Sequence, residues 1–175
     1  MIVAVPERVA WAVAALDVQP GDQLLEIGCG RGTAVREVCQ RLREGRIMAI
    51  DRSATMVRLA RERDADHVAA GRAVFQTAAL DRADLPARRF DKVFAINVNL
   101  FCVRSAINDL EVVRRALRPD GLLYLFYEPP SPSRVPAIAE RVVPFLSAQG
   151  FKTDTVTGTT KRGPTLLGIV GRPYR

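Results

Sequence analysis

The sequence is poor in the residues that build disulfide frameworks, zinc sites and membrane spans. Its 175 residues include three cysteines and one histidine, and no two cysteines have the spacing of a zinc-binding pair. An odd number of cysteines without close pairs favours a reducing compartment. No apolar run approaches the roughly 20 residues that a membrane span requires, and the N-terminus lacks the basic-then-apolar order of a secretory signal. We therefore expect a cytoplasmic protein with no metal site and no membrane partner.

Length and composition fit one folded domain. Hydrophobic residues make up 48% of the chain, which is enough for one buried sheet with helices on both faces and leaves no room for a second core. We predict a single domain over residues 1–175, with an N-terminal helix from Pro6 to Leu16 inside 1–20. Residues 129–136 form a candidate lid.

Acidic residues are fewer than basic ones, which leaves a formal charge of +7. A basic surface attracts phosphate backbones, but the arginines are spread over nearly every predicted helix and form no single run. Nucleic acid is therefore disfavoured as a partner. One arrangement stays open, a cluster in three dimensions of Arg88, Arg89, Lys161 and Arg162.

The most informative segment is LLEIGCGRGTA, residues 24–34. Leu24–Ile27 is typical of a buried strand, and the three alternate glycines that follow remove side chains that would block a ligand. A helix predicted from Thr33 to about Arg43 begins at this turn, so its free N–H groups face the same place. Glu26 adds a negative charge, which suits a ligand with an ammonium or hydroxyl groups better than a pyrophosphate.

The glycine spacing separates two classes of nucleotide-binding turn. The dinucleotide fingerprint is G-x-G-x-x-G, whereas this chain has Gly28, Gly30 and Gly32 and no glycine in the sixth place. The segment resembles instead motif I, E/D-x-G-x-G-x-G, of the class I S-adenosylmethionine-dependent methyltransferases. The resemblance implies a Rossmann-like fold with S-adenosylmethionine as cofactor. Cys29 lies inside the turn, where a small side chain is required, and we interpret it as structural.

An acidic residue closes the next predicted strand. Arg46–Ile50 is short and apolar and ends at Asp51. In the resembled family an acid at this position accepts hydrogen bonds from both ribose hydroxyls. The alternative is that Asp51, followed by Ser53, only caps the helix predicted from Ala54 to about Asp64. We favour ribose binding.

The segment after the third predicted strand, Ala73–Thr77, bears on the adenine. Family members commonly show G-D-A-x-x-L-P here, with the acid receiving the adenine amino group, and this resemblance places Asp81 in that slot with Leu80 instead of the glycine. The register stays open. Ala78–Ala79 is the alternative flank of the adenine, with Asp81 then a solvated loop residue.

The later segments follow the order of the same family. Phe90–Asn97 resembles its F-D-x-V-F-x-x-N strand, and a turn at Arg118–Gly121 joins the next helix to the next strand. These later elements are predicted as a helix over about Ser105–Leu117, a strand over Gly121–Tyr127, a helix over about Pro136–Ala148 and strands near Lys152–Thr157 and Thr165–Val170. The resemblance implies an α/β fold, a Rossmann-like three-layer sandwich whose seven-stranded, mostly parallel sheet has the order 3-2-1-4-5-7-6 with the last strand antiparallel.

The resemblance also implies which residues form the site. The cofactor contacts are expected from Glu26, Gly28, Cys29, Gly30, Gly32, Asp51, Arg52, Ala79, Leu80, Asp81 and Asn97. The candidate catalytic residues stand just beyond the fourth and fifth strands and are Asn97, Asn99, Tyr127 and Glu128. Three of the four have a structural alternative, because Asn97 can hold backbone, Tyr127 can be core and Glu128 can be a solvated loop acid. The single histidine, His67, lies away from this region, and we interpret it as a surface or helix-end residue.

The chain is thus predicted to be a methyltransferase for an unidentified acceptor, with a small molecule favoured and a homodimer left open. Two alternatives remain, a non-catalytic S-adenosylmethionine-binding module and a methyltransferase that acts on RNA or protein. A dinucleotide oxidoreductase is disfavoured by the glycine spacing and by the predicted closing hairpin. The Asn/Asp-Pro-Pro-aromatic pattern of N6-adenine enzymes is absent after the fourth strand, where the sequence is AINVN.

Overall fold

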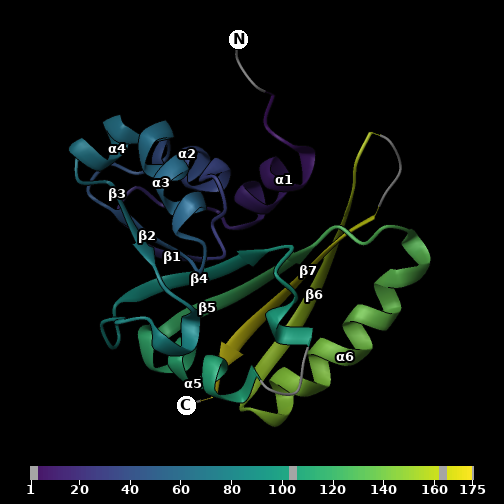
Figure 1. The fold of residues 1–175 in the computed structure, drawn as a ribbon. Coiled ribbons are helices and arrows are strands. Elements are labelled where there is room, and N and C mark those ends of the chain that lie inside the picture. The colour runs from purple at the N-terminus through teal and green to yellow at the C-terminus, as the bar shows by residue number, and fades with distance from the viewer. Residues whose placement is uncertain (1–3, 103–105, 162–164, 175) are drawn as a thin grey trace.

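One sheet carries the fold in this computed structural model, which describes residues 4–102, 106–161 and 165–174. Within them seven strands pair in the order β3-β2-β1-β4-β5-β7-β6 (Figure 1). The first five in chain order run parallel, and β7 is antiparallel to both β5 and β6. This confirms the predicted order and the closing hairpin. The strands are β1 (Gln23–Ile27), β2 (Arg46–Asp51), β3 (Ala73–Thr77), β4 (Phe90–Ile96), β5 (Leu117–Tyr127), β6 (Phe151–Thr159) and β7 (Thr165–Pro173).

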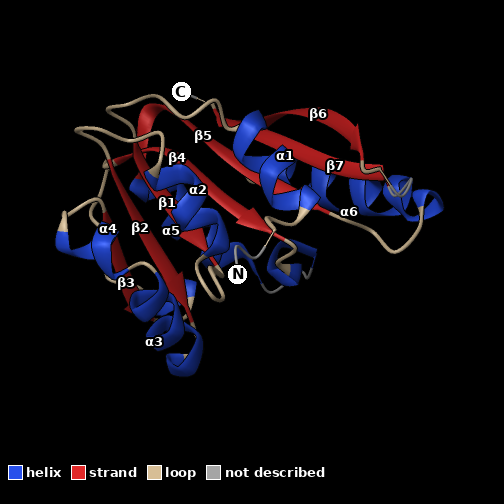
Figure 2. Ribbon diagram, turned by 90° about the horizontal axis from the view of Figure 1, so that it is seen from above, coloured by secondary structure: helices blue, strands red, loops and turns tan. Residues whose placement is uncertain are grey.

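Helices cover both faces of the sheet (Figures 1 and 2). One face carries α1 (Glu7–Ala15), α2 (Thr33–Cys39) and α3 (Ala54–Arg63), and the other carries α5 (Ile107–Ala116) and α6 (Val135–Ala148). The short α4 (Ala65–Ala69) and the 3-10 turns η1 (Leu80–Arg82), η2 (Asn99–Cys102) and η4 (Pro132–Arg134) connect them. Among the described residues, no helix combines the length and apolar character needed to span a membrane.

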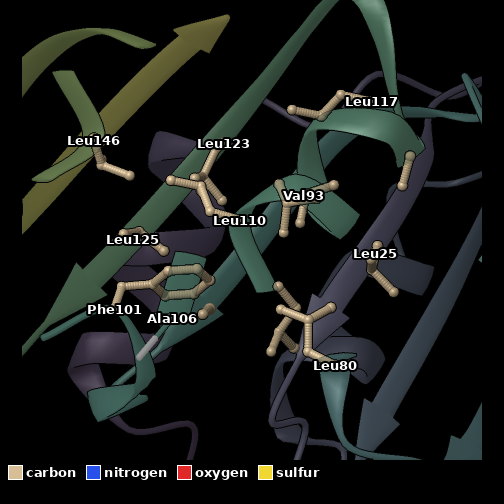
Figure 3. Packing of buried hydrophobic residues seen from close by; sticks show 14 of the residues in the cluster. Leu25, Leu80, Val93, Phe101, Ala106, Leu110, Leu117, Leu123, Leu125 and Leu146 are labelled. Carbon is tan, nitrogen blue, oxygen red and sulfur yellow. The ribbon is translucent and has the colours of Figure 1, made fainter. Parts of the chain in front are cut away.

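The central strands are apolar on both sides because both faces of the sheet are covered. Leu24 and Leu25 are adjacent in β1 and both are fully buried, yet their side chains belong to two different cores. Leu25 packs in the cluster between the sheet and α5, together with Val93, Leu110 and Leu123 (Figure 3). The continuous apolar run that predicted a central strand thus supplies both cores at once.

Two predicted boundaries are wrong, each because of a close backbone approach. The helix after the glycine turn ends at Cys39, before the predicted Arg43, because the chain turns back until the N–H groups of Arg43 and Gly45 both donate to Pro20 O. The predicted turn at Arg118–Gly121 is an irregularity inside β5, which pairs with β4 at Leu117 and again from Leu122. A Cβ at Gly121 would lie 2.8 Å from Phe90 O, so glycine permits this approach.

The start of the helix predicted at Ser105 falls outside the described residues, and α5 begins at Ile107. The hairpin strands β6 and β7 are each longer than predicted. The predicted N-terminal helix is present, and Val9, Val13 and Leu16 are buried along its inner side.

The single tryptophan fixes this N-terminal helix to the closing hairpin. Trp11 of α1 lies against Gly158 of β6 and Gly168 of β7, where the absence of side chains leaves room for the indole. Its ring meets the Phe126 ring of β5 edge-on at a centroid distance of 5.5 Å. The Lys161 N–H also donates to Glu7 Oε2 at 2.7 Å. The helix is therefore packed on the sheet beside the carboxyl end of β5.

Candidate active site

The three alternate glycines form a turn that only glycine adopts without strain. Gly28, Gly30 and Gly32 have φ angles of 71°, 52° and 76°, which lie in the left-handed region. The N–H groups of Gly28 and Cys29 both donate to Ile50 O at 2.8 and 3.0 Å, so the turn is fixed to the end of β2. A Cβ at Gly28 would lie 2.6 Å from Val98 Cγ2, whereas one at Gly30 would meet no atom within 4 Å. The turn therefore presents bare backbone to open space at Gly30.

Asp51 joins the end of β2 to this turn. Its Oδ2 accepts the Gly30 N–H at 2.9 Å, and its Oδ1 accepts the Ser53 N–H at 2.9 Å. Ser53 itself caps α3, since its Oγ accepts the Met56 N–H at 3.3 Å. The capping role left open by the sequence thus belongs to Ser53. A carboxylate has about four lone-pair positions, so Asp51 keeps acceptor capacity for a ligand.

Glu26 is the buried acid beneath the turn. Its side chain is 3% exposed, and Oε2 has no hydrogen-bond partner among the described residues. The pKa of Glu26 is raised from its usual 4.5 to about 8, mainly by burial and further by the nearby charges of Asp51 and Asp64. A buried carboxyl oxygen without a hydrogen-bond partner lowers the stability of the fold. The site therefore holds a carboxyl group that gains most from a positively charged or hydrogen-bond-donating ligand.

A second buried acid, Asp64, was not predicted as part of this region. It follows α3, is 1% exposed, and its Oδ1 accepts from Arg36 Nε of α2 at 2.7 Å. A Cβ at Gly32 would lie 2.6 Å from Asp64 Oδ2. The pair therefore connects the first turn of α2 to the end of α3 beside the third glycine. The sequence contained no signal for it, because Asp64 stands in an ordinary helix-end position.

The other residues expected to contact the cofactor differ in how far they are exposed. Leu80 is buried in the core at 4% exposure (Figure 3), so only its backbone remains available to a ligand. Ala79, Asp81 and Arg52 are exposed. Asp81 lies next to Asp109, whose pKa is raised mainly by burial and further by the Asp81 charge. The structure thus places Asp51, Ala79 and Asp81 together at the carboxyl ends of β2 and β3.

The candidate catalytic residues stand at the ends of β4 and β5. Asn97 has a φ of 54°, and its Oδ1 accepts the Glu128 N–H at 2.7 Å. The Glu128 carboxylate pairs with Arg8 of α1 at 3.1 Å, a contact that the sequence did not indicate. Asn99 is exposed in η2, whereas Tyr127 is 5% exposed and lies in the core. Asn97, Glu128 and Arg8 therefore form one linked group, whereas the Tyr127 side chain packs among core residues.

The structure also bears on the predictions for Cys29, for His67 and for a cluster of basic residues. Burial raises the pKa of the Cys29 thiol well above its ordinary value, which agrees with a structural residue rather than a nucleophile. His67 lies in the last turn of α4, as interpreted. The cluster of Arg88, Arg89 and Lys161 that the sequence left open does not form, because Arg88 and Arg89 precede β4 at its amino end, whereas Lys161 follows β6 at the opposite end of the strands. Arg162 falls outside the described residues.

The raised pKa of Glu26 predicts a pH-dependent stability. A carboxyl group with a higher pKa in the folded chain binds its proton more tightly when folded, so its contribution to the free energy of unfolding falls as the pH rises from about 4.5 to about 8. Glu26→Gln keeps the shape and removes the titration. We expect the variant to exceed the wild type in urea-unfolding free energy at about pH 8.5 by up to a few kcal/mol. The exposed Glu44→Gln is the matched control, and equal pH slopes in wild type and Glu26→Gln would refute the assignment.

Comparison with known proteins agrees with this geometry. Residues 24–121, more than half of the chain, match the family model described as a methyltransferase domain. The chain is 26% identical over 146 residues to the uncharacterized methyltransferase YdaC of Bacillus subtilis (81% of this chain and 78% of the relative). It is 31% identical over 166 residues to nocamycin O-methyltransferase of Saccharothrix syringae (87% and 54%). A methyltransferase from Aquifex aeolicus, described as S-adenosylmethionine-dependent, superposes with a TM-score of 0.73 at 16% identity (93% and 88%).

The matched segment begins in β1, contains the glycine turn and Asp51, and ends inside β5. It therefore includes the motifs on which the family resemblance was based. The chain spans between 31% and 78% of the length of the curated relatives that it matches. With more than half of its residues matched to the family and with the strand order expected for it, this chain belongs to the class I S-adenosylmethionine-dependent methyltransferases, and its cofactor is S-adenosylmethionine.

Proposed function

We propose that this chain transfers a methyl group to a small-molecule acceptor bound beside the carboxyl ends of β4 and β5. The observation that carries the proposal is the turn itself, where Asp51 accepts the Gly30 N–H at 2.9 Å and Glu26 is buried with an unpartnered oxygen. A bare glycine backbone between two carboxyl groups suits a ligand that carries hydroxyls and a positive group. S-adenosylmethionine carries both, and its sulfonium supplies an electrophilic methyl group when it is bound.

The chain's own residues would hold this cofactor by complementary charge and hydrogen bonding. We propose that Asp51 receives the ribose hydroxyls with the lone pairs that Gly30 and Ser53 leave free. Glu26 would neutralise the ammonium side of the ligand. Exposed Ala79 and Asp81 would flank the adenine. The three groups come from the ends of β1, β2 and β3, which lie side by side in the sheet.

Glu128 is the residue that we propose accepts a proton from the acceptor. It follows β5 directly, its N–H is held by Asn97 Oδ1 at 2.7 Å, and its carboxylate is paired with Arg8 at 3.1 Å. These contacts orient the carboxylate at the carboxyl ends of β4 and β5, where the proposed acceptor binds. A positioned base contributes when a hydroxyl or similar nucleophile must lose a proton. Tyr127 is less suited to this role because its side chain is buried among core residues.

A small-molecule acceptor is supported by the relative named nocamycin O-methyltransferase, at 31% identity over 87% of this chain. The segment between β5 and α6 is also short, since only Glu128–Ser131 separate β5 from η4. A long substrate-covering insertion is therefore absent from this connection, which lies inside the described residues. The segment proposed as a lid is largely helical, with η4 and the first residues of α6.

The proposal is tested by transfer of labelled methyl from S-adenosylmethionine to three sets of acceptors, namely hydroxyl- and amine-bearing small molecules, RNA and unfolded proteins. We expect label only in the small-molecule set. Once an acceptor is found, Glu128→Gln is expected to lower kcat by at least about 100-fold, with S-adenosylhomocysteine affinity retained. The exposed Glu140→Gln on α6 is the matched control. Label in RNA or protein alone would contradict the proposed acceptor class, and an unchanged kcat in Glu128→Gln would contradict the proposed base.

A further inference from the structure

A hollow lies at the amino ends of β4 and β5, opposite the carboxyl ends of the strands where the glycine turn lies. It has a volume of about 690 Å³ and is formed by the segment before β4, the second half of α5, the start of β5 and the residues that end β7. These elements meet at the amino ends of β4 and β5, because Phe90 pairs with Leu117 and Phe151 pairs with Pro173. Pro173 and Tyr174 line the hollow together with Arg114 and Arg115 of α5, which Figure 1 shows below β4 and β5. The hollow is therefore separate from the proposed methyl-transfer site.

Arginine dominates the lining of this hollow. Arg88, Arg114, Arg115 and Arg118 line it, together with one carboxylate, Glu111. Arg118 is neutralised by Asp91, at 2.6 Å. Arg114 donates to the Gln149 carbonyl at 3.3 Å and forms no ion pair with a described residue.

Arg88 and Arg115 have no ion pair or side-chain hydrogen bond with any described residue, and their backbones are joined. The Arg88 N–H donates to Arg115 O at 2.9 Å, and the Arg89 N–H donates to Ala116 O at 2.8 Å. This contact satisfies two carbonyls at the end of α5. It also holds Arg88 at a φ of 51°, a conformation that costs an arginine energy and that glycine would adopt freely. The fold thus holds two unpaired guanidinium groups at one hollow.

The helix end accounts for part of this charge, since cations near a helix C-terminus are favourable. It does not account for Arg88, which lies outside any helix and in a strained conformation. An aromatic side chain completes the lining. Tyr174 is 56% exposed, and its backbone is fixed because its N–H donates to Gly150 O at 2.8 Å.

We propose that this hollow binds a nucleotide, with the phosphate groups on Arg88 and Arg115 and the base against Tyr174. Guanidinium groups bind phosphate oxygens in bidentate fashion, and an exposed tyrosine ring provides a stacking surface that every base can use. A volume of about 690 Å³ falls in the range of small-ligand pockets. Free nucleotides and single-stranded RNA share this chemistry, and the experiment separates them.

The experiment is a calorimetric titration of the whole chain with ATP, inorganic tripolyphosphate and a short single-stranded RNA, at about 0.15 M salt so that distant surface charges are screened. We expect ATP or the RNA to bind. Arg88→Ala/Arg115→Ala should lower the affinity at least about tenfold. The control Arg58→Ala/Arg141→Ala removes two exposed arginines elsewhere and should change it less than about twofold. All variants should bind S-adenosylhomocysteine as the wild type does, which shows that they fold.

The three probes distinguish the two sources of phosphate. Binding of ATP supports a free nucleotide, and binding of the RNA alone supports a single strand as the source of the phosphates. Tyr174→Ala is expected to weaken ATP binding and to leave tripolyphosphate binding unchanged. Tripolyphosphate binding as tight as ATP would refute the contact with the base. The site itself would be refuted by no binding of any of the three probes, or by an equal loss of affinity in the control variant.

Discussion

Replacing Asp51 with alanine is expected to weaken S-adenosylhomocysteine binding by about 10- to 100-fold, because a hydrogen bond to a charged group contributes about 1.5–3 kcal/mol. The carboxylate is already placed by two backbone donors, Gly30 and Ser53, each at 2.9 Å. Its remaining lone pairs therefore point from a fixed position. The loss should appear in the dissociation constant measured by calorimetry.

The same substitution removes the partner of the Gly30 N–H, so a structural effect must be separated from a loss of ligand contact. Asp51→Asn keeps an acceptor oxygen for one of these donors and removes the charge. We expect its thermal stability without ligand to lie near that of the wild type, while its affinity for S-adenosylhomocysteine falls by nearly as much as in Asp51→Ala. Asp66→Ala, an exposed acid of α4, is the matched control. Unchanged affinity in both Asp51 variants would show that Asp51 does not contact the ligand.

Gly158→Ala is expected to destabilise the fold by about 2–3 kcal/mol, as an overpacked core does. A Cβ at Gly158 would lie 2.3 Å from Trp11 Nε1, inside van der Waals contact, and the indole has little freedom to move because it is packed between Gly158, Gly168 and Phe126. The free energy of unfolding in urea measures the effect. Gly21→Ala is the matched control, since a Cβ there would meet no atom within 4 Å.

A double-mutant cycle separates this steric clash from an effect on the strand itself. In a Trp11→Leu background the alanine at position 158 has room, so the added cost of Gly158→Ala should fall below about 1 kcal/mol. A cost that stays the same in both backgrounds would contradict the contact between the N-terminal helix and the hairpin. That contact matters for the site, because α1 also carries Arg8, the partner of Glu128.

The parts of the fold that the sequence predicted are those with a local physical cause. The strand Leu24–Ile27 and its glycine turn follow from an apolar run and from three residues without side chains, and both are found in place. The strand Ala73–Thr77 is also found with the predicted bounds. The order of the strands came from the family resemblance, and the structure confirms it.

What the sequence did not predict depends on contacts between distant segments. The shortening of α2 at Cys39 results from the N–H groups of Arg43 and Gly45, which both donate to Pro20 O. No glycine or proline lies between Cys39 and Gly45 to indicate that the helix ends early. The group of Arg8 with Glu128 joins the first helix to the fifth strand. Asp64 stands at a helix end like many solvated acids, yet it is buried against Gly32. Four arginines lie together at the amino ends of β4 and β5. The sequence alone did not indicate that the end of α5 lies beside the residues before β4.

The central claim is that the turn of Gly28, Gly30 and Gly32, with Asp51, binds S-adenosylmethionine. The most direct measurement is the melting temperature of the wild-type chain with S-adenosylmethionine, S-adenosylhomocysteine or NAD. A ligand that binds only the folded state stabilises it by about 2.7 kcal/mol at 100 times its dissociation constant, which raises the melting temperature by several degrees. We predict such a rise with S-adenosylmethionine and S-adenosylhomocysteine and none with NAD. A rise with NAD alone would contradict the account.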